Sequence, residues 1–332
     1  MANELTNLKK NDYTSEHIMD EKLELQAKIA WLYYIGNVTQ QDIAKQLSLS
    51  RPTVQRLLSL ALENGVVQVK IDHTVASSMD LAERLKKKFK LSECEVAPVE
   101  EATASQIDKA IAVTGGRFLE QVLRRSKISG VALGTGRAVR GICHEVSRHH
   151  LDDFKVVSLA GTVVLDGSFN RYDASLSLAD KTNGKYYILS IPLFAESLED
   201  RDYWYSTRTY RRQLGCYTDC QVALIGVGWL GEKCPLVDDG FITTDVMYEL
   251  LRKGAVGDVL GWVFDEQGLI INHPINECVT SFTQGVLLQR PVIGVAGGVR
   301  KHRAILAALR GGWLKGLITD QQTAEFLLSQ AD

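Results

Sequence analysis

After residue 92 the sequence alternates short apolar stretches with longer segments of helical periodicity, and this alternation constrains the fold more than any other feature. Strands that alternate with helices form a largely parallel, doubly wound sheet, because consecutive parallel strands need a crossover that a helix supplies. The expected strands are 93–97, 131–133, 156–159, 187–191, 222–227, 260–264, 269–271, 292–296 and 316–318. The expected helices include 79–90, 105–125, 138–146, 244–252 and 301–309. The sequence therefore predicts an α/β, Rossmann-like domain.

Several of the expected strands run into glycine-rich turns, and a doubly wound sheet binds its ligands outside the carboxyl ends of its strands. These turns contain Gly134, Thr135, Gly136 and Arg137 after the second strand, Gly161 and Thr162 after the third, and Gly297, Gly298 and Lys301 after the eighth. A turn without Cβ atoms lets a phosphate approach the backbone N–H groups that begin a helix. The turns predict a small hydroxylated or phosphorylated ligand, although such turns can also serve packing alone.

The first part of the chain follows a different pattern. Residues 1–21 are polar and aperiodic, which predicts a flexible tail. A helical stretch at 23–34 precedes a short helix capped by Thr39, a turn, a longer helix capped by Ser50, and an alternating stretch at 66–71 typical of a strand. This order predicts a winged helix-turn-helix over residues 22–73. Residues 74–332 are expected to form an effector-binding and oligomerisation domain, with a polar hinge at 74–78.

A helix-turn-helix places its recognition helix in the major groove of duplex DNA, with the N-terminal residues toward the bases. The candidate DNA-contacting residues are Thr39, Gln40, Ser50, Arg51, Thr53, Gln55 and Arg56. Arg51 suits a guanine edge and Gln55 an adenine edge, whereas Ser50, Thr53 and Arg56 suit phosphates. Residues 43–62 contain three basic residues and no acidic residue. Residues 1–72 contain eight basic and nine acidic residues, so a helical dimerisation or protein-binding module is the alternative.

The composition excludes several other classes of protein. The chain has 45% hydrophobic and 23% charged residues, which is typical of a globular protein, and its net charge of −2 argues against binding nucleic acid over the whole surface. The first 24 residues are too highly charged to contain the apolar region of a signal peptide, and no apolar run in the sequence approaches the length of a membrane helix. No membrane partner is therefore expected. Six scattered cysteines argue against a disulfide framework and favour a cytoplasmic location.

Two motifs suggest a cofactor or a metal, and each lacks a feature that such a site needs. Residues 226–231 match the dinucleotide-binding glycine fingerprint, but Pro235 and the residues before it do not open a periodic helix. His144 and His149 are separated by one residue too many for the zinc-binding pair of a metalloprotease helix. Neither a cofactor nor a metal ion is predicted, and no catalytic residue is assigned.

Three blocks of sequence carry a resemblance to a known family. Lys-Gly-Ala-Val-Gly-Asp-Val-Leu-Gly occupies 253–261, Ile-Gly-Val-Ala-Gly-Gly occupies 293–298 and Leu-Ile-Thr-Asp-Gln-Gln-Thr-Ala occupies 317–324. With the N-terminal module, they resemble the SorC-type sugar-responsive bacterial transcriptional regulators from about residue 25 to the end of the chain. The resemblance implies a tetrameric regulator whose effector domain is similar to the phosphosugar isomerase and deaminase fold.

The same resemblance implies roles for individual residues toward a sugar, polyol or sugar-phosphate effector. Asp258 would bind ligand hydroxyls, Leu260 would line the pocket and Lys301 would bind the anionic or polar end. The residues that would cradle a phosphate or sugar end, or form nearby walls, are Gly134, Thr135, Gly136, Gly161, Thr162 and 192–195.

Two functions remain open at this stage. The first is a transcriptional regulator of a carbohydrate catabolic operon, which would bind operator DNA and a small effector as a homodimer or homotetramer. The alternative is a phosphosugar isomerase or deaminase with an appended helical module, which would need a general base in its pocket. Asp258 and Asp320 are the candidates for that base, and Asp320 is expected to cap the last helix instead.

Overall fold

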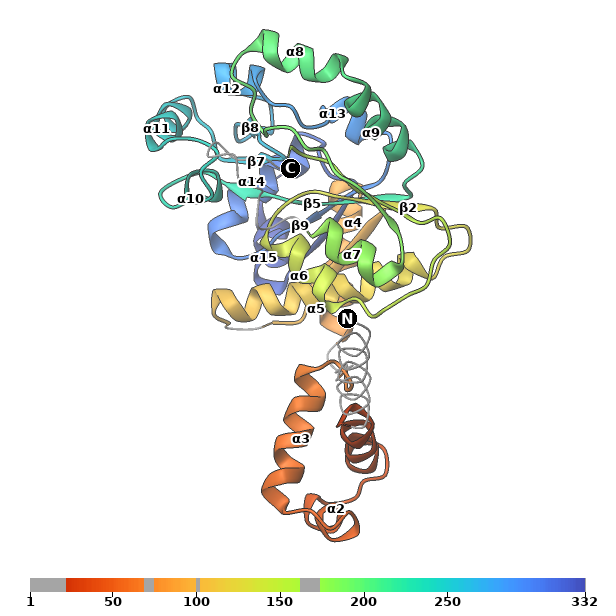
Figure 1. Ribbon diagram of the computed structural model, residues 1–332. Helices are drawn as coiled ribbons and strands as arrows, with labels where there is room; N and C mark the ends of the chain where they lie inside the picture. The colour runs from red at the N-terminus through yellow and green to blue at the C-terminus, as the bar shows by residue number, and fades with distance from the viewer. Residues whose placement is uncertain (1–21, 69–74, 100–101, 162–173, 332) are drawn as a thin grey trace, which may run out of the picture. The chain divides into compact units, whose positions relative to one another are not determined.

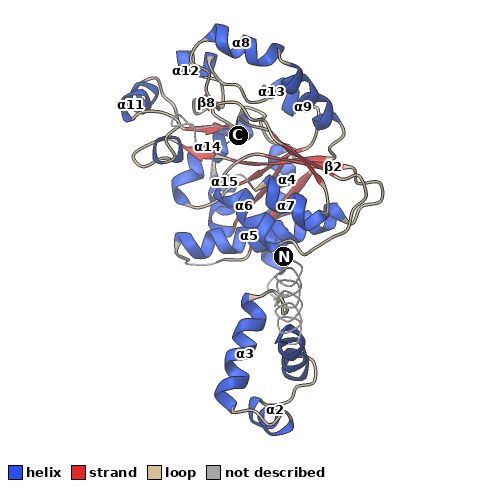
Figure 2. Cartoon of the chain, in the orientation of Figure 1, coloured by secondary structure: helices blue, strands red, loops and turns tan. Residues whose placement is uncertain are grey.

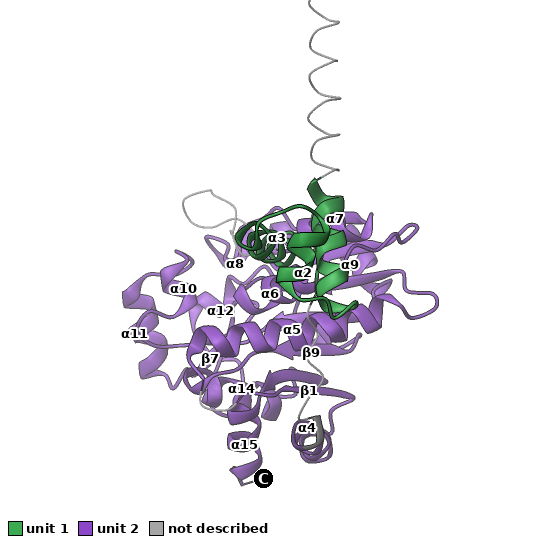
Figure 3. Ribbon diagram, turned by 90° about the horizontal axis from the view of Figure 1, so that it is seen from below, with its two compact units in different colours: residues 1–73 green, residues 74–332 purple. Residues whose placement is uncertain are grey.

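The computed structural model describes residues 22–68, 75–99, 102–161 and 174–331 (Figure 1). The chain divides into two compact units, residues 1–73 and residues 74–332 (Figure 3). Each unit has hydrophobic clusters of its own, so the two are described separately.

Three helices build the described part of the first unit. The first covers residues 22–34 and is followed by α2 (Gln40–Gln46) and α3 (Arg51–Glu63). The Thr39 side chain caps α2 by accepting a hydrogen bond from the Asp42 amide, and Ser50 caps α3 by accepting one from the Thr53 amide. One apolar face of each helix points inward, and Ile29, Ile43, Val54 and Ala61 are fully buried. The helix pair predicted from the sequence is confirmed.

The strand expected at 66–71 is absent from the part of it that the structure describes. Residues 66–68 continue from Gly65, whose φ of +71° favours glycine, and they form no strand. The Val67 amide donates to the Ala61 carbonyl at 2.9 Å, so this segment closes the end of α3 instead. The strand prediction is wrong for 66–68, and residues 69–71 lie outside the described residues.

The second unit contains a seven-stranded sheet in which every pair of neighbouring strands is parallel (Figure 2). Its strands are β1 (Glu93–Ala97), β2 (Gly130–Leu133), β3 (Lys155–Ser158), β4 (Lys185–Tyr187), β5 (Val222–Gly226), β9 (Val292–Val295) and β10 (Gly316–Asp320). Their order across the sheet is β1-β10-β9-β5-β2-β3-β4. The chain winds outward from β2 through β3 to β4 and then returns to β5, on the other side of β2. The predicted doubly wound sheet is confirmed.

Helices cover both faces of this sheet, which explains why its strands are almost continuously apolar. Val131 and Leu133 of β2 pack into one cluster, and Ala132 between them packs into the other. The first cluster includes residues of α5 (Ala104–Leu123), α6 (Arg137–Glu145) and α7 (Ser175–Thr182), which lie together in Figure 1. The second includes residues of α4 (Val75–Phe89), α9 (Arg208–Thr218), α14 (His302–Arg310) and α15 (Gln321–Ser329).

A small antiparallel sheet lies in the second cluster, and the sequence predicted only part of it. It consists of β6 (Gly228–Trp229), β7 (Gly257–Val259) and β8 (Trp262–Phe264), in that order. The remaining helices are α8 (Leu198–Ser206), α10 (Pro235–Asp238), α11 (Thr244–Arg252), α12 (Pro274–Glu277), α13 (Gln284–Leu287) and the 3₁₀ turn η1 (Val299–Lys301).

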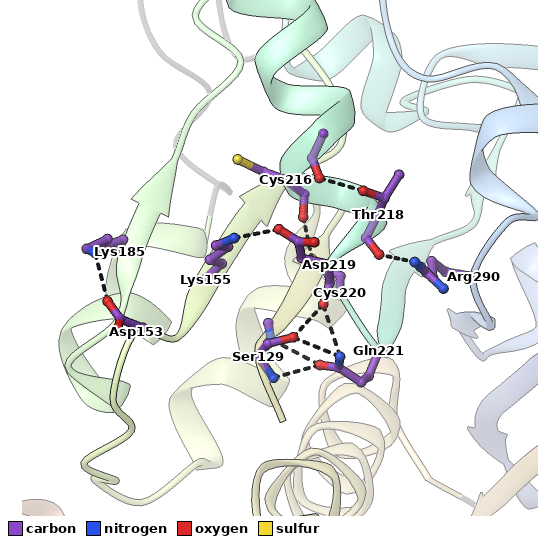
Figure 4. Close-up of polar contacts among 12 residues, drawn as sticks. Ser129, Asp153, Lys155, Lys185, Cys216, Thr218, Asp219, Cys220, Gln221 and Arg290 are labelled. Carbon is purple, nitrogen blue, oxygen red and sulfur yellow. Dashed lines mark hydrogen bonds and ion pairs between the residues drawn. The ribbon is translucent and has the colours of Figure 1, made fainter. Parts of the chain in front are cut away.

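The amino ends of the central parallel strands are joined by polar contacts (Figure 4). The Gln221 side-chain oxygen accepts hydrogen bonds from the amides of Ser129 and Gly130, at 2.9 and 3.1 Å. Lys155 at the start of β3 forms an ion pair with Asp219. The polar groups at this edge of the sheet are bonded to one another. The glycine turns lie at the opposite, carboxyl edge.

Two further expectations are corrected by the structure. The hinge expected at 74–78 is helical from Val75, where α4 begins, and Thr74 lies outside the described residues. The strand expected at 269–271 is a turn with a single bridge, between Ile270 and Phe264. The Asp265 carboxylate holds this turn by accepting hydrogen bonds from the amides of Gln267 and Leu269, at 2.9 and 3.0 Å.

Candidate functional site

A cavity of about 550 Å³ lies at the carboxyl edge of the parallel sheet. Its lining includes the turns that follow β2, β5 and β9, so it covers the point between β2 and β5 where the strand order reverses. Open α/β sheets bind their ligands at this topological position. The residues proposed from the sequence that line the cavity are Thr135, Gly136, Arg137, Asp258, Leu260 and Lys301, together with Leu193 of the proposed wall 192–195.

Asp258 in β7 is the most constrained polar group of the cavity. Its side chain is buried, and its Oδ2 accepts a hydrogen bond from the Gly261 amide at 3.1 Å. Gly228 stands opposite it in β6, where a Cβ atom would come within 1.9 Å of Oδ1. Only glycine at that position leaves room for the carboxylate. Burial raises the pKa of Asp258 to about 6, while the Gly261 amide and the charge of Lys301 act to lower it.

Lys301 is half-buried at the end of η1 and lies among charged groups from three other elements. Burial lowers the pKa of Lys301, the carboxylates of Asp108 and Asp258 act to raise it, and the guanidinium of Arg137 acts to lower it. Asp108 is on α5, and sequence reasoning did not select it. Its position five residues into a long helix carries no motif, so only the packing of α5 beside the sheet reveals it.

The N-terminus of α6 faces the same cavity. Gly136 is the residue before the helix, with a φ of +129°, and no side chain caps the first turn. Gly136, Arg137 and Ala138 all line the cavity. The backbone N–H groups of an uncapped first turn lack an intrahelical partner, and hydroxyl or anionic oxygens can accept from them.

Gly134 and Gly161 were also predicted for the site, but both pack against neighbouring segments. The position of Thr162 is not described. The Gly134 amide donates to the Leu224 carbonyl at 2.8 Å, and a Cβ atom on Gly134 would come within 2.8 Å of the Leu260 side chain. A Cβ atom on Gly161 would come within 2.4 Å of the Pro192 carbonyl oxygen. Neither glycine is part of the cavity lining. Thr162 lies outside the described residues.

The segment after β5 contributes a wall that sequence reasoning missed. Trp229 of β6 and Arg300 of η1 line the cavity, and the guanidinium carbon of Arg300 lies 5.8 Å from the Trp229 ring centroid. Pro235, Leu236, Asp239 and Phe241 complete this wall. The glycine fingerprint at 226–231 opens no long helix, because Gly228 and Trp229 pair with β7 instead. Discounting that motif as a dinucleotide site agrees with this geometry.

Asp320 has a structural role. Its Oδ1 accepts a hydrogen bond from the Thr323 amide at 2.9 Å, which caps α15 as expected. Its Oδ2 accepts from the Gly298 amide at 2.8 Å and from the Thr323 hydroxyl at 2.6 Å. The carboxylate thereby fixes the turn that precedes Lys301, and its hydrogen bonds are made within the protein.

The predicted DNA-contacting residues of the first unit fall into two groups. Thr39, Ser50 and Thr53 use their hydroxyl groups within helix caps, with 2.7 Å between the hydroxyl oxygens of Ser50 and Thr53. The side chains of the second group form no hydrogen bond or ion pair with any residue that the structure describes. They are Gln40, Arg51, Gln55 and Arg56, of which the last three are exposed.

No helix among the described residues is long and apolar enough to cross a membrane. All six cysteines are free, as their scatter along the sequence predicted.

Comparison with known proteins places this geometry in a family. A family model described as "Putative sugar-binding domain" matches residues 73–329. The chain is 30% identical over 316 residues to the erythritol catabolism regulatory protein EryD of Brucella abortus (strain 2308), covering 94% of this chain and 98% of that protein. It is 29% identical over 326 residues to the transcriptional regulator LsrR of Escherichia coli (strain K12), covering 95% of this chain and 97% of LsrR.

A solved structure matches along nearly the whole length as well. The full-length sorbitol operon regulator SorC from Klebsiella pneumoniae has a TM-score of 0.72 and 25% identity, over 92% of this chain and 98% of that chain. These matches include both the helix-turn-helix unit and the doubly wound unit. The chain therefore belongs to the SorC-type family of sugar-responsive transcriptional regulators.

Proposed function

We propose that this chain regulates transcription of a carbohydrate catabolic operon, and that a polyol, sugar or sugar phosphate in the cavity controls its affinity for operator DNA. The observation that carries the proposal is the buried Asp258 in a cavity it shares with Lys301, where the strand order reverses. The relatives named above are regulators, and two of their names refer to the polyols erythritol and sorbitol.

The lining has groups for both ends of such an effector. The Asp258 carboxylate accepts from ligand hydroxyls, and its burial makes those hydrogen bonds stronger than they would be in water. The first turn of α6, with Arg137 and Lys301, offers donors to a phosphate or to further hydroxyl oxygens. Leu260, whose φ is +52°, supplies an apolar contact at the β7–β8 turn.

The DNA contact would be made by the exposed side of α3. Gln55 and Arg56 are exposed there, and an Asn or Gln side chain can pair with an adenine edge in the major groove. Helix-turn-helix proteins bind paired half-sites as dimers, so the active form would be a homodimer or homotetramer. Thr39, Ser50 and Thr53 would act mainly through the caps that fix the two helices.

The test is thermal unfolding of the full chain with a panel of four- to six-carbon polyols, aldoses and their monophosphates. A ligand present at about 100 times its Kd stabilises the folded state by about 2.7 kcal/mol, which raises the Tm by several degrees. Asp258→Ala should lose the response to the ligand that stabilises the wild-type protein. Asp152→Asn should keep it, because Asp152 has a side-chain exposure of 99% and lies outside the cavity lining.

The same panel separates the regulator from the enzyme alternative. A stabilising ligand that is recovered unchanged supports the regulator, whereas conversion of a sugar phosphate at a catalytic rate supports the enzyme. Full stabilisation of Asp258→Ala at the wild-type ligand concentration would contradict the assignment of Asp258.

A further inference from the structure

A second hollow lies within the first unit. It has a volume of about 730 Å³, and its lining comes from the first helix, the turn before α2, the start of α2 and the first residue of α3. The polar residues that matter for its chemistry are Tyr33, Tyr34, Asn37, Gln40, Gln41 and Arg51.

These six side chains share one property. Among the residues that the structure describes, none of them forms a hydrogen bond or an ion pair. The adjacent polar residues differ, since the Thr39 hydroxyl donates to Asp42 at 2.7 Å and Lys45 lies 3.9 Å from the same carboxylate group. Asp42, the acidic residue of this segment, is therefore bonded to its neighbours and does not line the hollow.

The charge and hydrogen-bonding character of the lining define what the hollow can bind. Arg51 is its cation, and the lining contains no carboxylate. Phenol, amide and guanidinium groups all donate hydrogen bonds, and with Arg51 as the charged group the lining suits an anion whose oxygens accept them. A phosphodiester group has a single negative charge and accepting oxygens, and Arg binds phosphate oxygens in a planar, two-pronged geometry.

The position of the hollow indicates the source of that phosphate. When a recognition helix lies in the major groove, the preceding helix crosses the DNA backbone. The hollow joins the start of α3, at Arg51, to the start of α2, at Gln40 and Gln41. It therefore lies where the groove wall, which consists of phosphates, meets the helix pair.

We propose that this hollow binds one phosphate of the DNA backbone, with Arg51 as its ion partner and Tyr34, Asn37, Gln40 and Gln41 as neutral donors. The proposal rests on the DNA-binding function proposed above. It changes the role expected for Arg51 from the sequence, because a phosphate contact adds affinity for every duplex and does not select a base. Base selection is left to residues further along α3, beginning with Gln55.

The experiment uses a duplex of mixed sequence without an operator, on which base-specific contacts do not form. Affinity of the full chain is measured by fluorescence anisotropy between about 50 and 200 mM salt. Each phosphate contact contributes about 0.9 to the slope of log K against log salt concentration. Arg51→Ala should reduce the slope by that amount for each protomer in contact. Arg51→Lys, which keeps the charge, and Gln55→Ala should both keep the wild-type slope.

A second pair of variants tests the hollow itself. Gln41→Glu puts a negative charge beside the proposed phosphate and should weaken binding to the mixed-sequence duplex at least as much as Arg51→Ala does. Gln46→Glu makes the same change of charge on α2 outside the hollow and should have a much smaller effect. Circular dichroism checks that each variant is folded, and all the substituted side chains are exposed.

The results distinguish a failure of the phosphate site from a failure of the proposed DNA-binding function. A wild-type slope for Arg51→Ala, or equal weakening by Gln41→Glu and Gln46→Glu, would overturn the phosphate site while leaving DNA binding in place. Absence of any binding by the wild-type chain would remove the proposed DNA-binding function, and the phosphate site with it.

Discussion

Among single residues, Asp258 matters most for the proposed function. Its carboxylate is buried, accepts one hydrogen bond from a backbone amide and shares the cavity with Lys301. A buried acid with a raised pKa destabilises the unliganded protein, because the charged form lacks full solvation. Such a residue lowers the stability of the free protein, and a role in ligand binding explains why it is present.

The raised pKa of Asp258 predicts that the stability of the protein depends on pH. Raising its pKa from 3.8 to about 6 corresponds to about 3 kcal/mol. The folded state binds this proton more tightly than the unfolded state, so wild-type stability should fall as pH rises from about 4 to about 6 and then level off. Asp258→Asn, which has no such proton, should be the more stable protein at neutral pH in the absence of ligand.

Urea unfolding of the two proteins at several pH values checks this prediction. The difference in unfolding free energy should open between about pH 4 and about pH 6. A difference that is the same at all pH values would show that the carboxylate does not change its protonation over this range.

Among the helices and strands, α6 has two ends of different character. Its N-terminus is uncapped and faces the cavity, whereas its C-terminal carbonyls accept hydrogen bonds from Lys181. The Lys181 ammonium donates to the carbonyls of Cys143, His144 and Val146, at 3.0, 2.7 and 2.8 Å. A cation at the C-terminus also interacts favourably with the helix dipole.

Lys181→Met should therefore destabilise the second unit by about 1–3 kcal/mol, because the carbonyls lose charged donors. Lys185→Met is the matched control. Lys185 pairs with Asp153 on the surface, where solvent screens the ion pair, so its loss should change the stability little. Thermal unfolding of both variants makes the comparison, and equal losses would mean that Lys181 does not hold α6.

The β6–β7 pairing gives a second prediction at this scale. A Cβ atom on Gly228 would collide with the Asp258 carboxylate, whereas one on Gly215 of α9, outside the cavity lining, would meet nothing within 4 Å. Gly228→Ala should displace the carboxylate and weaken the binding of the stabilising ligand by about tenfold or more, which is about 1.4 kcal/mol. Gly215→Ala should change the ligand Kd much less. Calorimetric titration measures both constants, and similar values would contradict the role of the pairing.

The sequence predicted the parallel sheet well because its strands are short apolar segments between helices. Strand 93–97 and helix 244–252 have the predicted bounds. It failed at β6 and β7, which have two and three residues and lie among glycines. β6 finds its partner β7 far along the chain, although β7 also pairs with β8 across a short turn. Residues 74–78 were expected to form a hinge, but α4 begins at Val75 and packs on β1, which makes 75–78 its first turn.

The site residues also divide into those with a local sequence signal and those placed by tertiary packing. Arg137, Asp258 and Lys301 were found because glycine turns and a family motif mark them, and all three line the cavity. Asp108, Trp229 and Asp239 were missed, since each comes from a segment whose place beside the cavity is decided by tertiary packing. Gly134 carries the same glycine signal, yet its position is one of packing against Leu260.

For the whole molecule, the proposed function requires that the two units are coupled. A ligand can change the affinity for DNA only if it binds the DNA-competent and DNA-incompetent forms with different affinities, and that difference sets the size of the change. Coupling free energies between sites are typically about 1–3 kcal/mol, or roughly 5- to 150-fold in affinity. In a homo-oligomer, such a shift would change the spacing of the paired recognition helices.

The most direct test measures the Kd of the full chain for a duplex selected from a random pool by the wild-type protein. The measurement is made with and without a saturating concentration of the ligand that stabilises the second unit. We predict that the ligand changes the Kd about fivefold or more, and that Asp258→Ala binds the duplex without this response. A ligand that stabilises the wild-type protein through Asp258 and leaves the Kd unchanged would contradict the account.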